Sequence, residues 1–222
     1  ISGTVPTFDA TDTGVTNDYS VCTSSNAFGV STCTMKSAKA ETKTLAITGP
    51  IADTGGTVSF TAGAASTATS TITGTGPVVA DDTATSTVTI TLQDVFSNPI
   101  SGTVPTFDAT DTGTTNGYTV CTSSNASGVS TCTMKSTRAE TKTLAITAPI
   151  ADSGGTVSFV AGSAVAANST ITGTGPVVAD DTATSTVTIT LIDNFNNPLI
   201  GTVPTFDATD TGTTNDYSVC TS

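Results

Sequence analysis

The five cysteines are the residues whose type and spacing most directly suggest a chemistry, the oxidation of two thiols to a disulfide. The stretch CTSSNAFGVSTC runs from Cys22 to Cys33, and its near-copy CTSSNASGVSTC runs from Cys121 to Cys132. Each segment is rich in turn-forming residues and lies between stretches that favour strands. We therefore predict the disulfides Cys22–Cys33 and Cys121–Cys132, each closing the neck of a hairpin, in an oxidising compartment.

The fifth cysteine, Cys220, follows Cys121 at the same distance at which Cys121 follows Cys22, which is 99 residues. A partner at the matching place would stand beyond Ser222, the last residue. We therefore expect Cys220 to be unpaired by truncation and to have no chemistry of its own.

Other chemistries of these side chains are disfavoured. The sequence has no histidine and no Cys-x-x-Cys pair, which argues against a zinc site and against a histidine-based hydrolase triad. A serine–lysine pair is conceivable, but we expect Lys36, Lys39 and Lys43 to occupy solvent-facing strand positions. We predict that the chain is not an enzyme and has no catalytic residue.

Paired carboxylates recur with the same period and suggest a cation, because calcium takes several carboxylate and carbonyl oxygens. Asp81-Asp82 recurs as Asp180-Asp181, near the expected domain junctions, where an ion could stiffen a fibre. These four residues are our candidate calcium ligands, and no other cofactor is expected. The alternative is turn chemistry, in which aspartate caps and bends the chain.

Two asparagines match the N-glycosylation pattern Asn-x-Ser/Thr, namely Asn125 and Asn168. The first copy lacks both matches, because Phe28 and Thr69 stand at the corresponding places. Chance matches are expected in a chain so rich in serine and threonine, and exposed threonines could also carry O-linked sugar. Asn125 and Asn168 are kept as candidate glycosylation positions.

The composition limits the partners and the fold. Lys plus Arg number 6 against 18 Asp plus Glu, for a net charge of −12, which argues against nucleic acid and anionic membrane surfaces. There is no apolar run of about 18 residues, so we expect no membrane insertion in this segment. About a quarter of the residues are threonine, which favours strands, whereas Leu, Glu and Lys are scarce, which disfavours long helices.

The chain is an internal repeat of 99 residues. Residues 1–99 align with 100–198 without a gap and are identical at 83 positions, and residues 199–222 begin a third copy. A cluster of differences at 61–69 against 160–168 is small and polar, as in a linker. We therefore predict a partial domain at 1–64, a complete domain at 65–163 and a second partial domain at 164–222.

Strand patterns fill the complete repeat. Ser86–Leu92 alternates threonine with Val88, Ile90 and Leu92, as a half-buried strand does. The full set of predicted strands is 77–80, 86–92, 102–107, 118–121, 129–134, 142–146 and 155–160. Pro105 predicts an edge or a bulge, and DTGGT at Asp53 and DSGGT at Asp152 read as hairpin turns. Seven short strands with turn residues between them predict an all-β fold of tandem two-sheet sandwiches.

The whole repeat resembles the bacterial Ig-like domains of group 1. STVTITLQDVFSNPISGTVPTFDATD (86–111) is similar to the strand–Asp-x-x-x-Asn-Pro–strand opening of that family, and SNASGVSTCTMKS (124–136) to its Gly-Val strand. ETKTLAITAPIADSGGTVSFVAG (140–162) resembles its closing strands. The resemblance implies an Ig-like sandwich, exposure outside the cell and no catalysis, in tandem stalks such as those of intimin- and invasin-type adhesins. The hairpin cysteines and the near-identical neighbours depart from the family pattern.

These observations favour a structural segment of a long extracellular bacterial fibre or stalk, whose partners are neighbouring copies of the same domain. The first alternative is an adhesin whose repeats bind a host, cell or matrix partner, in which residues that differ between copies, such as Phe28 against Ser127, would matter. A further alternative is a filament subunit assembled by strand complementation between the half-domains. Residues 199–222 repeat residues 1–24, so both segments would compete for the same position in a complemented domain, which argues against this alternative.

Overall fold

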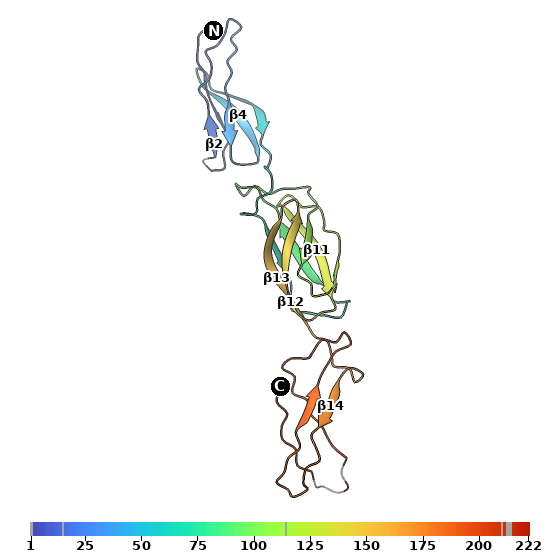
Figure 1. Ribbon diagram of the computed structural model, residues 1–222. Helices are drawn as coiled ribbons and strands as arrows, with labels where there is room; N and C mark the ends of the chain where they lie inside the picture. The colour runs from blue at the N-terminus through green and yellow to red at the C-terminus, as the bar shows by residue number, and fades with distance from the viewer. Residues whose placement is uncertain (1, 15, 114, 210, 212–214) are drawn as a thin grey trace.

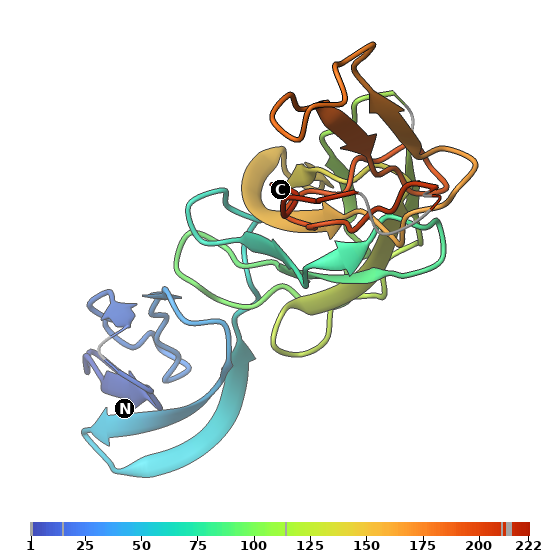
Figure 2. The same cartoon turned by 90° about the horizontal axis from the view of Figure 1, so that it is seen from below.

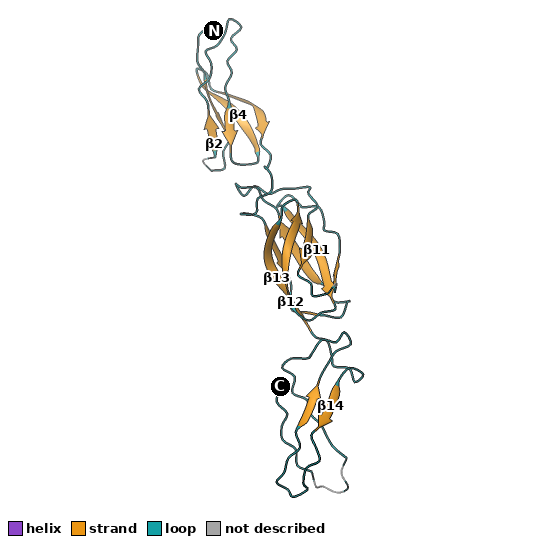
Figure 3. Ribbon diagram, viewed as in Figure 1, coloured by secondary structure: helices purple, strands orange, loops and turns teal. Residues whose placement is uncertain are grey.

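The structure, a computed structural model, consists of strands joined by turns and loops, and it describes every residue except 1, 15, 114, 210 and 212–214. Figure 1 shows three units in a row, which we name by their predicted boundaries: the N-terminal unit (1–64), the middle unit (65–163) and the C-terminal unit (164–222). The boundary positions stay a prediction. The described residues contain no helix of the length and apolarity that crossing a membrane requires, as the strands and loops of Figure 3 illustrate.

The strands follow the repeat. Those of the N-terminal unit are β1 (Thr7–Ala10), β2 (Asn17–Tyr19), β3 (Met35–Ser37), β4 (Thr42–Gly49) and β5 (Asp53–Ser59). Those of the middle unit are β6 (Thr71–Gly74), β7 (Val78–Val79), β8 (Ser86–Thr91), β9 (Thr106–Ala109), β10 (Asn116–Tyr118), β11 (Val129–Ser136), β12 (Thr141–Ala148) and β13 (Asp152–Val160). The C-terminal unit has β14 (Thr170–Gly173) and β15 (Val187–Thr190).

The middle unit is a sandwich of two four-stranded sheets, with strand orders β10-β11-β8-β6 and β7-β13-β12-β9. The pairings are antiparallel except for the short parallel contact between β7 and β13. One buried cluster lies between the sheets and includes Ile72, Val88, Ile90, Leu92, Cys132, Met134, Leu144, Ile146, Val157 and Phe159. The predicted all-β sandwich of two sheets is therefore confirmed for the middle unit.

Alternation of side chains explains how these strands build the core. In β8, Ser86, Val88 and Ile90 are fully buried, while the threonines between them lie on the outer face. The predicted strand at 102–107 begins later, at Thr106, because Pro105 has no N–H to donate. Strand β9 is the edge of its sheet, as this proline predicted. The short β6 was missed, so the unit has eight strands where seven were predicted.

The prediction of hairpin turns at DTGGT and DSGGT is wrong. Both stretches lie in strands, β5 and β13, and the chain reverses before them. In β13 the pairing with β12 shifts by one residue at Gly155, which is the mark of a bulge. A side chain at Gly155 would overlap the backbone of Ile72 in β6. The glycines therefore let the two sheets approach each other closely, which explains them without a turn.

The flanking units contain parts of the same sandwich. The N-terminal unit has the sheet β1-β4-β5 and the pair β2-β3, and the C-terminal unit has the pair β14-β15. Figure 2 shows the long strands β4 and β5 as a curved ribbon apart from the middle unit. Each pairing between the named strands joins two strands of one unit, so what connects the units is not a shared sheet.

Candidate functional site

Both predicted cysteine pairs are bonded in the structure, Cys22 to Cys33 and Cys121 to Cys132, with Cα atoms 4.3 Å apart in each pair. In the middle unit the bond lies in the core, where Cys121 is 7 % exposed and Cys132 is 3 % exposed. The bond joins β11 to the segment that follows β10, at a buried position that an apolar side chain would otherwise fill. Cys220 is a half-buried free thiol.

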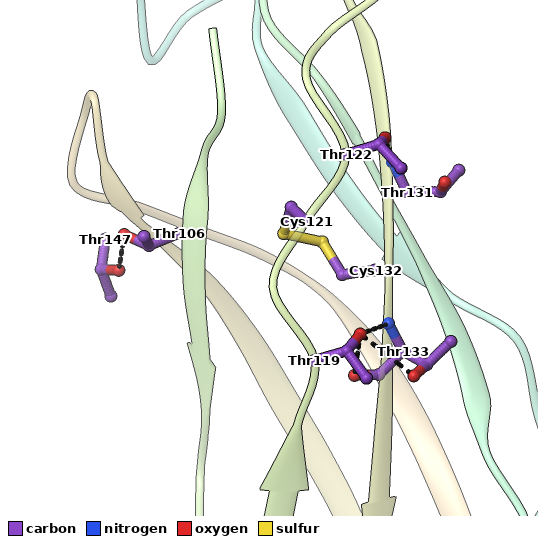
Figure 4. Close-up of a disulfide and its surroundings, with 8 residues drawn as sticks. All are labelled: Thr106, Thr119, Cys121, Thr122, Thr131, Cys132, Thr133 and Thr147. Carbon is purple, nitrogen blue, oxygen red and sulfur yellow. Dashed lines mark hydrogen bonds between the residues drawn. A yellow bond between two sulfur atoms is a disulfide. The ribbon is translucent and has the colours of Figure 1, made fainter.

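The segment that carries Cys121 forms a bulge. Two backbone hydrogen bonds flank it, from Thr119 N to Thr133 O (3.0 Å) and from Thr122 N to Thr131 O (2.9 Å). Two residues, Val120 and Cys121, therefore face the single residue Cys132. The Oγ1 atoms of Thr119 and Thr122 accept the amide protons of the same two partners, at 2.8 and 2.9 Å, around the disulfide drawn in Figure 4. Threonine hydroxyls thus take amide protons that a regular ladder pairs with carbonyls.

Among the described residues of the middle unit, Lys142 is the buried basic side chain, whereas Lys135 and Arg138 are partly exposed. Lys142 lies on the inner face of β12 and is 0 % exposed. Its Nζ donates to Glu140 Oε1 at 2.6 Å, to Asp111 Oδ1 at 3.3 Å and to Thr115 Oγ1 at 3.3 Å. Glu140 Oε2 also accepts a hydrogen bond from Thr112 Oγ1 at 2.6 Å. We call Lys142, Glu140, Asp111 and Thr115 the lysine cluster, and it ties the loop between β9 and β10 to the start of β12.

The N-terminal unit repeats the lysine cluster with Lys43, Glu41, Asp12 and Thr16. The prediction that Lys43 faces solvent is wrong, because its exposed fraction is 0 %, whereas Lys36 and Lys39 are exposed as predicted. The reason is the alternation of β4, which places Lys43 on the same face as Leu45 and Ile47. The ammonium group reaches the carboxylates at the edge of the sheet, while its carbon chain packs inside.

The charges of the cluster stabilise each other. Burial lowers the pKa of Lys43, but the hydrogen bond to Glu41 and the two carboxylate charges outweigh it, so the pKa lies above its usual value. The hydrogen bond from Lys142 lowers the pKa of Glu140. The cluster therefore acts as an ion pair that holds structure.

The four candidate calcium ligands occupy turns. Asp81 Oδ1 accepts the amides of Thr83 at 2.8 Å and of Ala84 at 2.7 Å, and these hydrogen bonds lower the pKa of Asp81. Asp82 has a positive φ of 59° and pairs with Lys135 at 3.0 Å. Asp180 and Asp181 repeat the turn conformation. Among the described residues no three His, Cys, Asp or Glu side chains lie close enough to hold a metal together. The turn role is thus visible, and calcium binding stays a prediction.

The two candidate glycosylation positions differ in their surroundings. Asn125 is exposed, and its Oδ1 accepts the amides of Ser127 and Val129 in the turn of the cysteine hairpin. Asn168 is half-buried, and its Nδ2 donates to Asp193 O at 2.7 Å. A glycan on Asn168 would compete with that bond, whereas the hydrogen bonds of Asn125 in this turn are accepted by its oxygen. Glycosylation of either residue stays a prediction.

The feature that the sequence analysis missed is the contact between units. The loop Asp94–Asn98, which we call the first joint loop, belongs to the middle unit but binds the N-terminal unit. Asn98 Nδ2 donates to Ala38 O at 2.9 Å, and Asn98 Oδ1 accepts the amide of Ala40 at 2.8 Å. Asp94 Oδ2 accepts the amide of Gly63 in the linker at 2.8 Å. Asp94 and Asn98 are 3 % and 4 % exposed.

The second joint loop, Asp193–Asn197, repeats this contact between the middle and C-terminal units. Asn197 binds Thr137 O at 2.9 Å and the amide of Ala139 at 2.8 Å, and Asp193 Oδ2 accepts the amide of Gly162 at 2.9 Å. The Asp-x-x-x-Asn-Pro spacing was the signal in the sequence. Its partners lie about sixty residues earlier in the chain, which the spacing does not reveal.

The fold and the sequence of the middle unit define a class. Residues 66–162 match the sequence model of the family described as invasin, domain 3. The middle unit is therefore a bacterial Ig-like domain of the adhesin type, as the resemblance indicated, and this type of domain is not an enzymatic one. The match covers less than half of the chain, and the flanking units repeat parts of the sequence of the middle unit.

Solved structures of bacterial proteins share the fold. FdeC, an adhesin of Escherichia coli, has a TM-score of 0.62 at 20 % identity over 96 % of this chain and 71 % of its own. InvD of Yersinia pseudotuberculosis has a TM-score of 0.60 at 21 % identity, over 88 % and 62 %. Invasin, a bacterial integrin-binding protein, has a TM-score of 0.53 at 19 % identity, over 90 % and 41 %. The chain thus spans less than two thirds of the InvD and invasin chains, and no curated protein sequence matches it.

Proposed function

We propose that this chain is a structural segment of a long extracellular bacterial stalk or fibre made of tandem Ig-like units. The observation that carries the proposal is that the same end-to-end contact occurs twice. Both joint loops place a buried aspartate and a buried asparagine against the preceding unit, with matching partners one repeat apart. A repeated contact of this kind sets the same step from one unit to the next and extends the chain in one direction.

Two further features support a position outside the cell. Disulfides persist in oxidising compartments and are rare in the cytosol, and each cysteine hairpin contains one. The net charge of −12 makes neighbouring stalks repel one another and stay soluble. Neighbouring copies of the same unit are then the partners of each unit in the stalk.

Binding by the repeats themselves is the second candidate, and one observation favours it. Phe28 is 91 % exposed at the tip of the first cysteine hairpin, where the middle unit has Ser127. Exposed aromatic side chains are frequent at the centres of protein interfaces. The Phe28→Ser variant gives the first cysteine hairpin the residue that the middle unit has at this position, Ser127, and so serves as the matched control.

The experiment coats beads with the full chain and offers them to host cells and to matrix proteins. A stalk segment predicts attachment equal to that of beads coated with an inert protein, for both the natural chain and Phe28→Ser. Attachment that soluble chain competes away, and that Phe28→Ser abolishes, would instead establish the repeats as the binding element.

Assembly by strand complementation is the third candidate. The sheet of the N-terminal unit has an open apolar face lined by Phe8, Met35, Leu45 and Val58, and the β14–β15 hairpin has the same sequence as 71–91, which covers this face in the middle unit. Light scattering of the native chain tests this assembly. A mass of 21.9 kDa at all concentrations would reject assembly between copies. A mass that grows with concentration would support it.

A further inference from the structure

We propose that the two joint loops are orientation locks, in which each unit fixes its own direction on the unit before it and orders the turn that precedes β4 or β12 of that unit. This inference rests on the proposed stalk function and adds the residues that determine its stiffness. The lock consists of Asp94 and Asn98 at the first joint and of Asp193 and Asn197 at the second.

Each polar side-chain atom of Asp94 and Asn98 has a hydrogen-bond partner. Asn98 donates to Ala38 O and to Asp94, and its oxygen accepts the amide of Ala40. Asp94 Oδ1 accepts the amides of Phe96 and Asn98, and Oδ2 accepts those of Gly63 and the Asn98 side chain. A tilt that separates the units exchanges the hydrogen bonds of Ala38, Ala40 and Gly63 for hydrogen bonds to water, and each such exchange has a net cost.

The lock holds the neighbouring unit at two separate places. Asp94 binds the linker through Gly63, and Asn98 binds the turn at residues 38–40. Asp94 therefore fixes the linker itself, and Asn98 holds the turn through two hydrogen bonds, one donated to Ala38 O and one accepted from the amide of Ala40. A fixed linker together with a turn held by both ends of one amide group restrains rotation as well as bending, so the lock fixes a direction and not only a distance.

The lock acts in one direction along the chain. In the second joint the C-terminal unit supplies Asn197, whereas the middle unit supplies only backbone groups, Thr137 O and the amide of Ala139. The residue after this turn is Glu140, whose carboxylate binds Lys142. The successor therefore orders the turn that leads into the lysine cluster of the unit before it, through a side chain of the successor and backbone groups of the predecessor.

The first test is hydrogen exchange on the full chain. In Asn197→Ala, exchange in the segment containing Ala139 is expected to accelerate roughly tenfold, because one buried hydrogen bond is lost, while the segment containing Ala40 keeps its rate. Asn98→Ala is the matched control and is expected to show the reverse pattern. Equal exchange at Ala139 in Asn197→Ala and the natural chain would overturn the lock.

The second test reads the direction itself. Spin labels on non-natural amino acids at Thr87 and Thr186, exposed and equivalent positions in adjacent units, give the distribution of distances across the second joint. We expect a narrow distribution in the natural chain and in Asn98→Ala, and one at least twice as wide in Asn197→Ala. If Asn197→Ala does not fold, the isosteric Asn197→Asp replaces it in this test. Asn197→Asp removes the donor and adds a charge beside Asp193, and it too is expected to widen the distribution of distances.

The outcomes separate the lock from the stalk. A narrow distribution in every variant would overturn the lock and leave a stalk that is stiff for another reason. A broad distribution in the natural chain would overturn both, since the joint would then be a free hinge.

Discussion

The N-terminal and middle units have nearly the same sequence and bury it to very different degrees. Ile146 in β12 is 1 % exposed, whereas its counterpart Ile47 in β4 is 38 % exposed. Strand β11 has eight residues, but the matching β3 has three. The difference is β6 and β8: β8 pairs with β11 in one sheet, and the two strands help to cover the other sheet, which carries Ile146. The comparison shows that strand length in this repeat depends on the neighbouring strand, and burial on the sheet packed against it.

Other features are the same in both units. Lys43 and Lys142 are both fully buried against the same three kinds of partner, and both disulfides have the same Cα separation. These contacts are made within one sheet and its own loops. The repeat therefore combines a locally determined half with a half that needs its partner strands.

The largest effect is expected from removing a core side chain that only one unit buries. Ile146→Ala is expected to lower the free energy of unfolding of the middle unit by about 2–5 kcal/mol, through lost burial and a cavity. Ile47→Ala, the same change in the open sheet, should cost less than about 1 kcal/mol, because little burial is lost. Exchange of core amides in each unit measures both values, and equal costs would refute the comparison.

A smaller effect is expected from the disulfide. Replacing Cys121 and Cys132 together by alanine opens a loop of about a dozen residues and should cost about 3 kcal/mol in the chain-entropy account. Cys220→Ala is the control and should leave the middle unit unchanged. Thermal unfolding with and without reductant checks this, and a double variant as stable as the natural chain would show that the bond adds nothing to the sandwich.

The lysine cluster should contribute less again. Lys142→Met keeps the carbon chain and removes the charged donor, so Glu140 and Asp111 lose their partner, and we expect a loss of about 1.5–3 kcal/mol. Lys36→Met, at an exposed position, should stay within about 0.5 kcal/mol. Denaturant unfolding of both variants gives the values. A neutral or stabilising Lys142→Met would mean that the cost of burying the ammonium cancels its bonds.

The smallest effect is expected from acid, which protonates the joint aspartates and so lowers the stability of the joints. Burial raises the pKa of Asp94, but the hydrogen bonds from Asn98 and from the amides of Gly63 and Phe96 outweigh it, so its pKa lies below the usual value, and Asp193 behaves alike. A lowered folded pKa gives stability above the unfolded value of about 3.9, which is lost as pH falls through the folded pKa. In high salt, which screens the net charge, Tm should be constant from about pH 7 to 5 and fall below about pH 4. A Tm that rises on acidification in high salt would contradict this.

The sequence predicted the features that depend on neighbours along the chain. Alternation in Ser86–Leu92 placed β8 and its inward residues, and the matching hairpins placed both cysteine pairs. The four-residue β6 was missed because Thr71–Gly74 is too short to show a period. Lys142 shares its face with Leu144 and Ile146, so alternation did place it inward, but its charge argued against burial until its carboxylate partners were visible.

The joints lie beyond this kind of prediction. Asp94 and Asn98 form an ordinary turn signal, and nothing near them identifies the backbone of residues 38–40 as a partner. Such contacts depend on how one folded unit meets another. Glycines 154 and 155 show the same limit inside a unit, since their role depends on the close approach of β6.

Small-angle X-ray scattering of the full chain in solution tests most directly the central claim that successive units are held in line. The account predicts the scattering of a rod, with a maximum dimension equal to that of the three units in a row (Figure 1) and a cross-section of one unit. A distribution of bent forms, with a shorter mean dimension and no rod-like region, would contradict it.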